Sequence, residues 1–177
     1  MKKITTRELV FMALLVSLNI VLTRVASIRL SIGGVEGIRI GFGGFPVILA
    51  GIMFGPVSGG IVGAIGDIVG YYINPMGPYM PHFTLTAALT GIIPAAILMP
   101  FKKTVPSFWQ LLLAIAIGQT VTSVILVPYF LQMLFKIPMA VTLPGRIIGQ
   151  ALHVPVYALF AEVLLKRINL ALHYNIR

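Results

Sequence analysis

The chain has 177 residues, of which 58% are hydrophobic and 10% are charged, and its mean hydropathy is +1.01. Soluble domains carry roughly 25% charged residues, so this composition excludes an ordinary water-soluble protein and predicts an integral protein of the lipid bilayer. The net charge is +9, but the 13 basic residues are scattered in ones and twos, which excludes a continuous nucleic-acid-binding face, and the absence of cysteine excludes disulfides and thiolate metal sites.

Six apolar segments, bounded by glycine, proline or charged residues, follow one another along the chain. Each reaches or approaches the ~20 residues with which a helix crosses a bilayer. The first follows a short basic start, but no Ala-x-Ala site follows it, so we interpret it as a transmembrane helix rather than a cleaved signal peptide. The segments are residues 8–26, 40–54, 56–73, 83–100, 108–135 and 143–165.

These segments predict the fold class. We expect an all-α integral membrane protein with a single domain over residues 1–177, built as a bundle of six transmembrane helices. The second segment is short and rich in glycine, which predicts a tilted or broken helix. The fifth is long and contains Pro128, which predicts a kink or an end near that residue.

The basic residues near the helix ends predict the orientation of the bundle. If the N-terminus is cytoplasmic, eight of them lie on the inner side and five on the outer side, which favours cytoplasmic positions for both termini. Five outer cations are more than topology requires, so we expect some of them to serve a site. The inner residues are Lys2, Lys3, Arg7, Lys102, Lys103, Lys166, Arg167 and Arg177, and the outer ones are Arg24, Arg29, Arg39, Lys136 and Arg146.

Asp67 lies in the run GAIGDIVGYY of residues 63–72, among glycine, aliphatic and aromatic neighbours. An ionised carboxylate near the middle of a membrane helix costs at least ~2.5 kcal/mol, so such residues face the interior of the bundle or an aqueous cavity. Gly59, Gly63 and Gly70 share its helix face, which forms a stripe of small residues that a neighbouring helix can approach closely. Two interpretations stay open: a ligand-binding carboxylate, or an internal salt bridge or hydrogen bond to another helix.

Polar residues form further stripes at helical spacing in the later segments. Each residue alone has a structural explanation, because interior histidines and threonines are commonly hydrogen-bonded within the protein. Several stripes that converge on the outer half instead predict a polar cavity that opens outward, since a bundle that needed only stability would place apolar side chains there. The stripes are Arg146, Gln150, His153 and Tyr157; His82, Thr86 and Thr90; and Gln119, Thr122 and Tyr129.

Two outer loops complete the predicted site. The first, residues 29–39, mixes glycine with Arg29, Glu36 and Arg39. The second, residues 71–81, is rich in aromatic residues, methionine and proline. Its flat or polarizable surfaces suit an aromatic ligand, although a tyrosine here is also typical of an interfacial belt. The residues that provide these surfaces are Tyr72, Met76, Tyr79 and Met80.

These residue types predict the chemistry of the ligand. A carboxylate accepts two parallel hydrogen bonds from paired N–H donors, and arginine binds carboxylates or phosphates in the same bidentate manner. A flat heteroaromatic molecule with paired N–H donors and an anionic tail therefore suits the cavity. Pterins and their glutamate conjugates fit this description, and so do a few phosphorylated cofactors.

Two runs of the chain resemble a known family. They are GFGGFPVILAGIMFGPVSGGIVGAIGD (41–67) and PYMPHFTLTAALTGIIP (78–94). On these runs the sequence resembles the folate-specific substrate-binding subunit, or S component, of energy-coupling factor (ECF) transporters. The resemblance implies a six-helix protein of the bacterial cell membrane that captures folate with high affinity, without cofactor or enzymatic activity. It also implies delivery of folate to an ECF module of one transmembrane coupling protein and two ATPase subunits.

The resemblance implies roles for individual residues. Asp67 would accept hydrogen bonds from the pterin N–H groups, and Ala13 and Ser17 would dock onto the coupling protein. Serine at this second position departs from the alanine usual in the family, but it still permits close packing. The residues implied for the aromatic slot are Tyr79, His82, Phe83 and Thr84; those for the glutamate tail are Arg24, Arg29, Arg39 or Arg146; further expected contacts are Glu36, Tyr72, Gln150 and His153. For Arg24, a side chain that extends to the lipid headgroups is the alternative.

Three other functions compete with this one. An intramembrane enzyme is disfavoured because the sequence has no H-E-x-x-H or G-x-S-x-G motif and no carboxylate cluster to hold a metal. A channel is disfavoured because the polar residues concentrate in the outer half instead of following the full depth of the bilayer. An S component for another vitamin, such as riboflavin, is the closest alternative.

Overall fold

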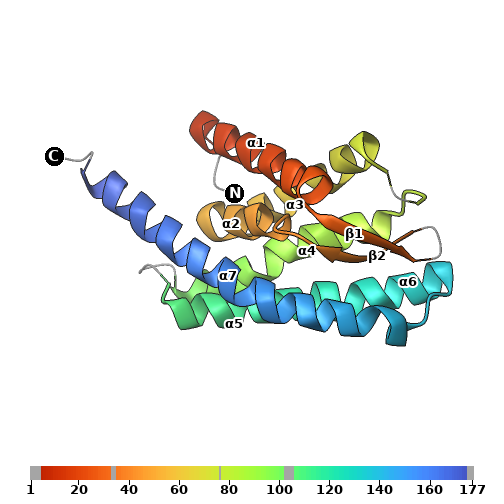
Figure 1. Cartoon of the computed structure of the whole chain (residues 1–177). Coiled ribbons are helices and arrows are strands. Elements are labelled where there is room, and N and C mark those ends of the chain that lie inside the picture. Colours follow the sequence, from red (N-terminus) through yellow and green to blue (C-terminus); the bar gives the residue numbers. More distant parts are fainter. Residues whose placement is uncertain (1–4, 33–34, 76, 102–105, 175–177) are drawn as a thin grey trace.

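The computed structural model describes residues 5–32, 35–75, 77–101 and 106–174, and for residues 29–40 and 168–174 it describes the backbone alone. Within these ranges the chain forms a helical bundle with a two-stranded hairpin toward one end (Figure 1). We call this end of the bundle the hairpin end. The opposite end, at which the first helix begins and the last helix ends, we call the terminal end. The helices are α1 (Thr6–Ile20), α2 (Gly44–Phe54), α3 (Pro56–Ile73), α4 (Pro81–Leu98), α5 (Phe108–Gln119), α6 (Val127–Phe135) and α7 (Met139–Tyr174).

Among the described residues, five helical stretches are long and apolar enough to cross a membrane, which confirms the predicted membrane bundle. Helix α2 is apolar but has only 11 residues, about 16 Å at 1.5 Å per residue, and is shorter than the ~30 Å hydrocarbon core. The predicted second segment, residues 40–54, is therefore too long, because Ile40 ends a strand and the helix begins only at Gly44. The five stretches are residues 6–25, 56–73, 81–101, 108–135 and 139–167.

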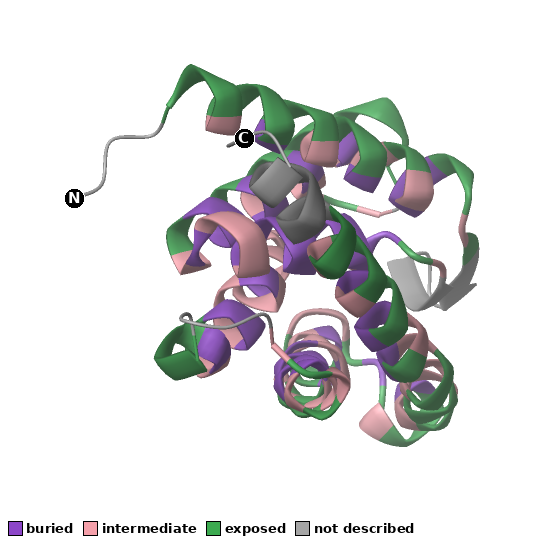
Figure 2. Ribbon diagram, turned by 90° about the vertical axis from the view of Figure 1, so that its left-hand side faces the viewer, coloured by how far each residue is buried: buried purple, intermediate pink, exposed green. Residues whose placement is uncertain are grey.

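The burial pattern suits surrounding lipid. Figure 2 views the bundle from the terminal end, with buried faces turned toward neighbouring helices and exposed faces turned outward. Large apolar side chains lie on these outer faces, such as Leu14 (61% exposed) on α1, Val57 (71%) on α3 and Leu113 (60%) on α5. Such a surface is a liability in water but matches hydrocarbon.

Glycines allow α2, α3 and α4 to pack backbone against backbone. A Cβ atom on Gly91 would lie 2.6 Å from the carbonyl oxygen of Gly59, and a Cβ atom on Gly59 would lie 2.7 Å from the Cα atom of Gly51. A Cβ atom on Gly63 would collide with the carbonyl oxygen of Ala87. The stripe of small residues on α3 therefore faces a neighbouring helix, as its spacing predicts, and the structure shows that this helix is α4.

The predicted fifth segment is one continuous stretch, in which the π-helical segment η3 (Thr120–Leu126) joins α5 to α6. Pro128 lies in the first turn of α6, and the predicted distortion takes the form of the wider π turn before it instead of a break. A second π-helical segment, η1 (Val21–Val25), extends α1. The 3₁₀ turn η2 (Met99–Phe101) follows α4.

The predicted first loop, residues 29–39, is instead a β-hairpin of β1 (Ile28–Ile32) and β2 (Val35–Ile40). The strands are antiparallel, with Ile28 opposite Ile40. Apolar and polar residues alternate in IRLSI and in IRI, and a Gly-Gly pair separates the two strands, which is the sequence pattern of a hairpin. The other described elements are helical, which confirms the all-α class, and the hairpin is a local addition where the glycines predict a loop.

Replacement of Gly91 by alanine should destabilise the bundle by about 1–3 kcal/mol, because the new methyl group meets backbone atoms of Gly59 that cannot move aside. Thermal unfolding of the purified protein in detergent measures the effect. Gly149→Ala on α7 is the matched control, because a Cβ atom there has no neighbour closer than 3.8 Å. Equal melting temperatures for Gly91→Ala and wild type would contradict the close packing of α3 on α4.

Candidate functional site

A cavity of about 220 Å³ lies between the helices in the half of the bundle nearer the hairpin. One buried water needs only about 10–15 Å³, so this volume is far larger than a packing defect. It lies between the helices that carry the predicted polar stripes. Its polar lining residues are Asn19, Thr23, Arg24, Asp67, Tyr71, Tyr79, Thr86, Thr90, Gln119, Thr122, Ser123, Arg146, Gln150, His153 and Tyr157.

Asp67 is held by partners on two other elements. Arg24 Nη2 lies 3.4 Å from Asp67 Oδ1, and the two side chains are only 6% and 16% exposed. Thr84 Oγ1 donates a hydrogen bond of 2.8 Å to Asp67 Oδ2 and lies 2.9 Å from the Tyr79 hydroxyl. The structure thus contains the internal salt bridge and the threonine hydrogen bond that the sequence left open. It also places the cavity beside the same carboxylate, so the two interpretations of Asp67 are compatible.

The position of Arg24 depends on the end of α3. Arg24 Nη1 donates to the carbonyl oxygen of Asn74, and Asn74 Nδ2 donates to the carbonyl oxygen of Arg24, each over 3.4 Å. A Cβ atom on Gly70 would lie 2.9 Å from Arg24 Nε, so glycine leaves the room in which the arginine crosses α3. The arginine is buried and directed into the bundle, which excludes the alternative that it extends to the headgroups.

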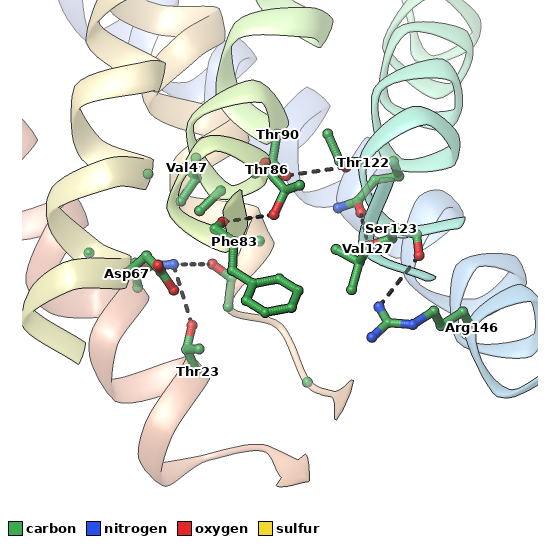
Figure 3. Close-up of a pocket in the computed structure, with 18 of the residues that line it drawn as sticks. Thr23, Val47, Asp67, Phe83, Thr86, Thr90, Thr122, Ser123, Val127 and Arg146 are labelled. Atoms are coloured by element: carbon green, nitrogen blue, oxygen red, sulfur yellow. Dashed lines mark hydrogen bonds between the residues drawn. The ribbon is translucent and has the colours of Figure 1, made fainter. Parts of the chain in front are cut away.

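A second polar wall comes from α5, η3 and α7. Arg146 Nη1 donates to the carbonyl oxygen of Ser123 over 3.4 Å, and Gln150 Nε2 donates to the carbonyl oxygen of Gln119 over 3.0 Å. Figure 3 shows Asp67 and Arg146 on opposite sides of the cavity, with the Phe83 ring between them. A carboxylate paired with one arginine therefore faces a second arginine across an aromatic ring.

The turn between the hairpin and α2 contributes to the lining of the cavity. The Tyr157 hydroxyl donates to the carbonyl oxygen of Gly41 over 3.1 Å, and Asn19 Nδ2 donates to that of Gly43 over 2.6 Å. His153 stacks on Tyr157, with ring centroids 5.6 Å apart and 11° between the planes. These contacts hold the turn between α1 and α7 and place a flat aromatic pair in the lining.

The structure brings many of the predicted site residues to the cavity. Thr84 lies behind the lining, where it holds Asp67. Arg29, Glu36 and Arg39 lie in the hairpin strands, and their side chains fall outside the described residues, so their roles stay predictions. The predicted residues that line the cavity are Arg24, Asp67, Tyr79, Phe83, Arg146, Gln150 and His153.

Tyr72 and His82 are absent from the lining, and these two predictions need correction. Tyr72 is 75% exposed, and Tyr71 takes the inward position because it lies four residues after Asp67, about one helical turn. His82 packs on Phe130 with ring centroids 5.0 Å apart, and the lining stripe of α4 begins one residue later.

The lining also contains Asn19, Thr23 and Ser123, which the sequence analysis missed. Asn19 and Thr23 have the i, i+4 spacing that identified the other stripes, so the same rule applied to the first segment would have found them. Ser123 lies within the π-helical segment η3 and stands four residues after Gln119, so the same spacing also connects it to the predicted stripe of Gln119 and Thr122.

The arrangement is equipped to bind a small molecule. Two partners occupy only part of the lone pairs of the Asp67 carboxylate, which leaves capacity for N–H donors of a ligand. Arginine can bind an anionic group, and the aromatic rings can stack on a flat one. Within the described ranges no group of three His, Cys, Asp or Glu residues is placed to hold a metal ion.

The fold and the cavity together define a class of protein: a membrane-embedded helical bundle with a polar-lined cavity of the size of a small-molecule site within one half of its depth. Residues 3–170 match the family described as "ECF-type riboflavin transporter, S component". The chain belongs to this family of S components of ECF-type transporters.

Comparison with individual proteins gives closer likenesses. The chain is 36% identical to the folate transporter FolT of Clostridium novyi (strain NT) over 159 residues, which cover 90% of this chain and 87% of the relative. It is 26% identical to the folate transporter FolT of Leuconostoc mesenteroides subsp. mesenteroides over 133 residues, which cover 75% and 68%.

Solved structures also share the fold. One is described as "Crystal structure of FolT bound with folic acid", with a TM-score of 0.76, 25% identity, and coverage of 93% of this chain and 97% of that one. Another, "Structure and mechanism of the S component of a bacterial ECF transporter", has a TM-score of 0.65 at 21% identity, with coverage of 94% and 97%.

Replacement of Arg24 by methionine should lower stability by about 3 kcal/mol, because Asp67 stays buried without its positive partner. The double variant Arg24→Met/Asp67→Asn should recover much of this loss, since no uncompensated charge remains. Thermal unfolding in detergent without ligand measures both, with the exposed Arg7→Met as control. A double variant no more stable than Arg24→Met would show that the ion pair does not explain the loss.

Proposed function

We propose that the chain captures folate on the outer side of a bacterial cell membrane and delivers it to an ATP-driven ECF module for uptake. The observation that carries the proposal is the 36% identity, over 90% of the chain, to a protein named folate transporter FolT. The fold shared with a FolT structure that contains folic acid supports it. In this proposal the hairpin end faces outward and both termini are cytoplasmic.

The chemistry of the cavity supports folate as the ligand. The pterin ring presents paired N–H donors, and the Asp67 carboxylate can accept them beside its existing partners. The ring is flat, and Phe83 and Tyr79 provide aromatic surfaces in the lining. The glutamate tail is anionic. We assign it to Arg146, because Arg24 is committed to Asp67 and Arg146 lies across the cavity from it.

An exposed pair of small residues on α1 supports docking to the coupling protein of the module. Ala13 and Ser17 both lie on the exposed surface of the helix, one turn apart. The Ser17 hydroxyl donates to the carbonyl oxygen of Ala13 over 3.0 Å. Because this bond satisfies the hydroxyl within the helix, serine can replace alanine without leaving an unpaired donor in a close helix contact.

Riboflavin is the second candidate ligand, because the description of the matching family names a riboflavin transporter. Riboflavin also has a flat ring with an N–H donor. It has no carboxylate, however, and would leave Arg146 in the cavity without an anionic ligand group. Both curated relatives described above are named folate transporters, which favours folate.

Isothermal titration of the purified protein in detergent should show that folic acid binds more tightly than riboflavin. Asp67→Asn should weaken folic acid binding at least ~10-fold, because hydrogen bonds to a charged group are each worth about 1.5–3 kcal/mol and the amide offers one oxygen in place of two. Thermal unfolding without ligand verifies that the variant folds.

Glu162→Gln is the control for this titration, because Glu162 pairs with Lys166 at 2.7 Å on α7 and does not line the cavity. Its affinity for folic acid should equal that of wild type. Unchanged affinity in Asp67→Asn would remove this residue from the binding site. Tighter binding of riboflavin than of folic acid would replace the proposed ligand by the second candidate.

Ala13→Trp should abolish ATP-dependent folate uptake in liposomes that contain the ECF module, because the bulky side chain prevents a close helix contact. Folic acid binding to the isolated variant should stay unchanged, since Ala13 is exposed and does not line the cavity. Leu113→Trp on the exposed face of α5 is the control and should support uptake. Full uptake by Ala13→Trp would exclude α1 as the docking helix.

A further inference from the structure

The side-chain amide of Gln150 has a defined orientation. Its Nε2 atom donates to the backbone carbonyl oxygen of Gln119 over 3.0 Å and lies 3.3 Å from Gln119 Oε1. A backbone carbonyl can only accept a hydrogen bond, so the NH₂ group of Gln150 must face it. This contact resolves the usual ambiguity between the nitrogen and the oxygen of an amide. Gln150 Oε1 is then the side-chain atom that makes no hydrogen bond to Gln119.

Gln150 Oε1 is a buried acceptor without a hydrogen-bond partner among the described residues. The residue itself lines the cavity. Buried polar atoms in native proteins almost always have a partner, and an exception calls for a ligand or water that completes it. The cavity is the space from which such a partner can come.

Gln119 restrains this arrangement from several sides. Its side-chain Oε1 accepts from Gln150 Nε2 and, over 3.3 Å, from Ser123 Oγ. It is only 7% exposed, and a Cβ atom on Gly44 would lie 3.1 Å from its Nε2 atom, so the turn before α2 packs against the amide. Gln119 cannot turn over its amide without loss of the bond from Gln150 Nε2, because two NH₂ groups would then face each other.

We propose that Gln150 Oε1 accepts a hydrogen bond from an N–H group of the bound ligand, and that Gln119 is the positioning residue that holds this oxygen in place. The inference rests on the proposed function, because it concerns the ligand of the same cavity. It gives the site a second acceptor besides Asp67. A ligand with a carbonyl oxygen or an unprotonated ring nitrogen at this point is rejected, because two acceptors would face each other without a proton.

The test uses isothermal titration of wild type and Gln150→Met with folic acid and with analogues in which each of its N–H groups is methylated in turn. Folic acid should bind Gln150→Met about 10-fold more weakly than wild type. For one analogue, the loss of affinity caused by methylation should be about 10-fold smaller in Gln150→Met than in wild type, because the variant no longer uses that N–H group. Gln132→Met, exposed on α6, is the matched control and should behave as wild type.

The role of Gln119 is tested by a double-mutant cycle. Gln119→Met removes the side-chain contact of Gln150 Nε2 but keeps the bond to the backbone carbonyl, so it should weaken folic acid binding a few-fold, by less than Gln150→Met. In the Gln150→Met background it should have little effect, because the side chain that Gln119 positions is absent. Gln119→Glu keeps the side-chain acceptor for Gln150 Nε2 and should bind folic acid more tightly than Gln119→Met. A loss that is equal in both backgrounds would overturn the positioning role.

Equal folic acid affinity of Gln150→Met and wild type, or identical methylation losses in both, would overturn the assignment of Gln150 Oε1. Failure of the proposed function has a different signature: wild type binds riboflavin but not folic acid. In that case the same comparison with riboflavin and its N3-methyl derivative decides the assignment, because the ring N–H is then the donor that Gln150 must accept.

Discussion

The ion pair between Arg24 and Asp67 is the interaction on which the rest of the site depends. A carboxylate inside a membrane bundle is tolerated only if other groups compensate its charge, and here an arginine and a threonine from separate elements do so. The need to compensate this charge also affects the backbone. The π-helical segment η1 carries the arginine, and Gly70 leaves the space that its side chain crosses. The compensation of one buried charge thus links η1, which extends α1, to the end of α3.

The ion pair leaves the neighbouring cavity open, and this distinguishes a binding site from a purely structural polar core. The groups around Asp67 are held by contacts within the protein itself, and such pre-organisation lowers the cost of binding. Across the cavity, Arg146 and the Gln119–Gln150 pair are held by carbonyl groups of neighbouring helices. The apolar outer faces of the bundle and this polar interior have the same origin, because lipid forces every polar group to find its partner inside.

Regular periodicity made much of the fold and part of the site predictable from the sequence. The apolar runs predicted the long helices, and the spacing around Asp67 predicted its inward direction and a close glycine contact with a neighbouring helix, which is α4. Other features were not predicted. The glycines of residues 29–39 indicated a loop where the structure has a hairpin, and the inward tyrosine is Tyr71 and not Tyr72. The pairing of Asp67 with Arg24 joins residues 43 positions apart. No spacing rule within one helix can predict a partner on another helix, so such contacts required the structure.

The most direct test of this account is an experimental structure of the protein with folic acid bound. The pterin ring should lie in the cavity beside Phe83, with its N–H donors on Asp67 and its glutamate tail toward Arg146. The bundle should match the fold described above, with Arg24 still near Asp67. Folic acid bound elsewhere, with the Asp67 carboxylate contacting only Arg24 and Thr84, would show that the buried charge is structural and would contradict the central claim.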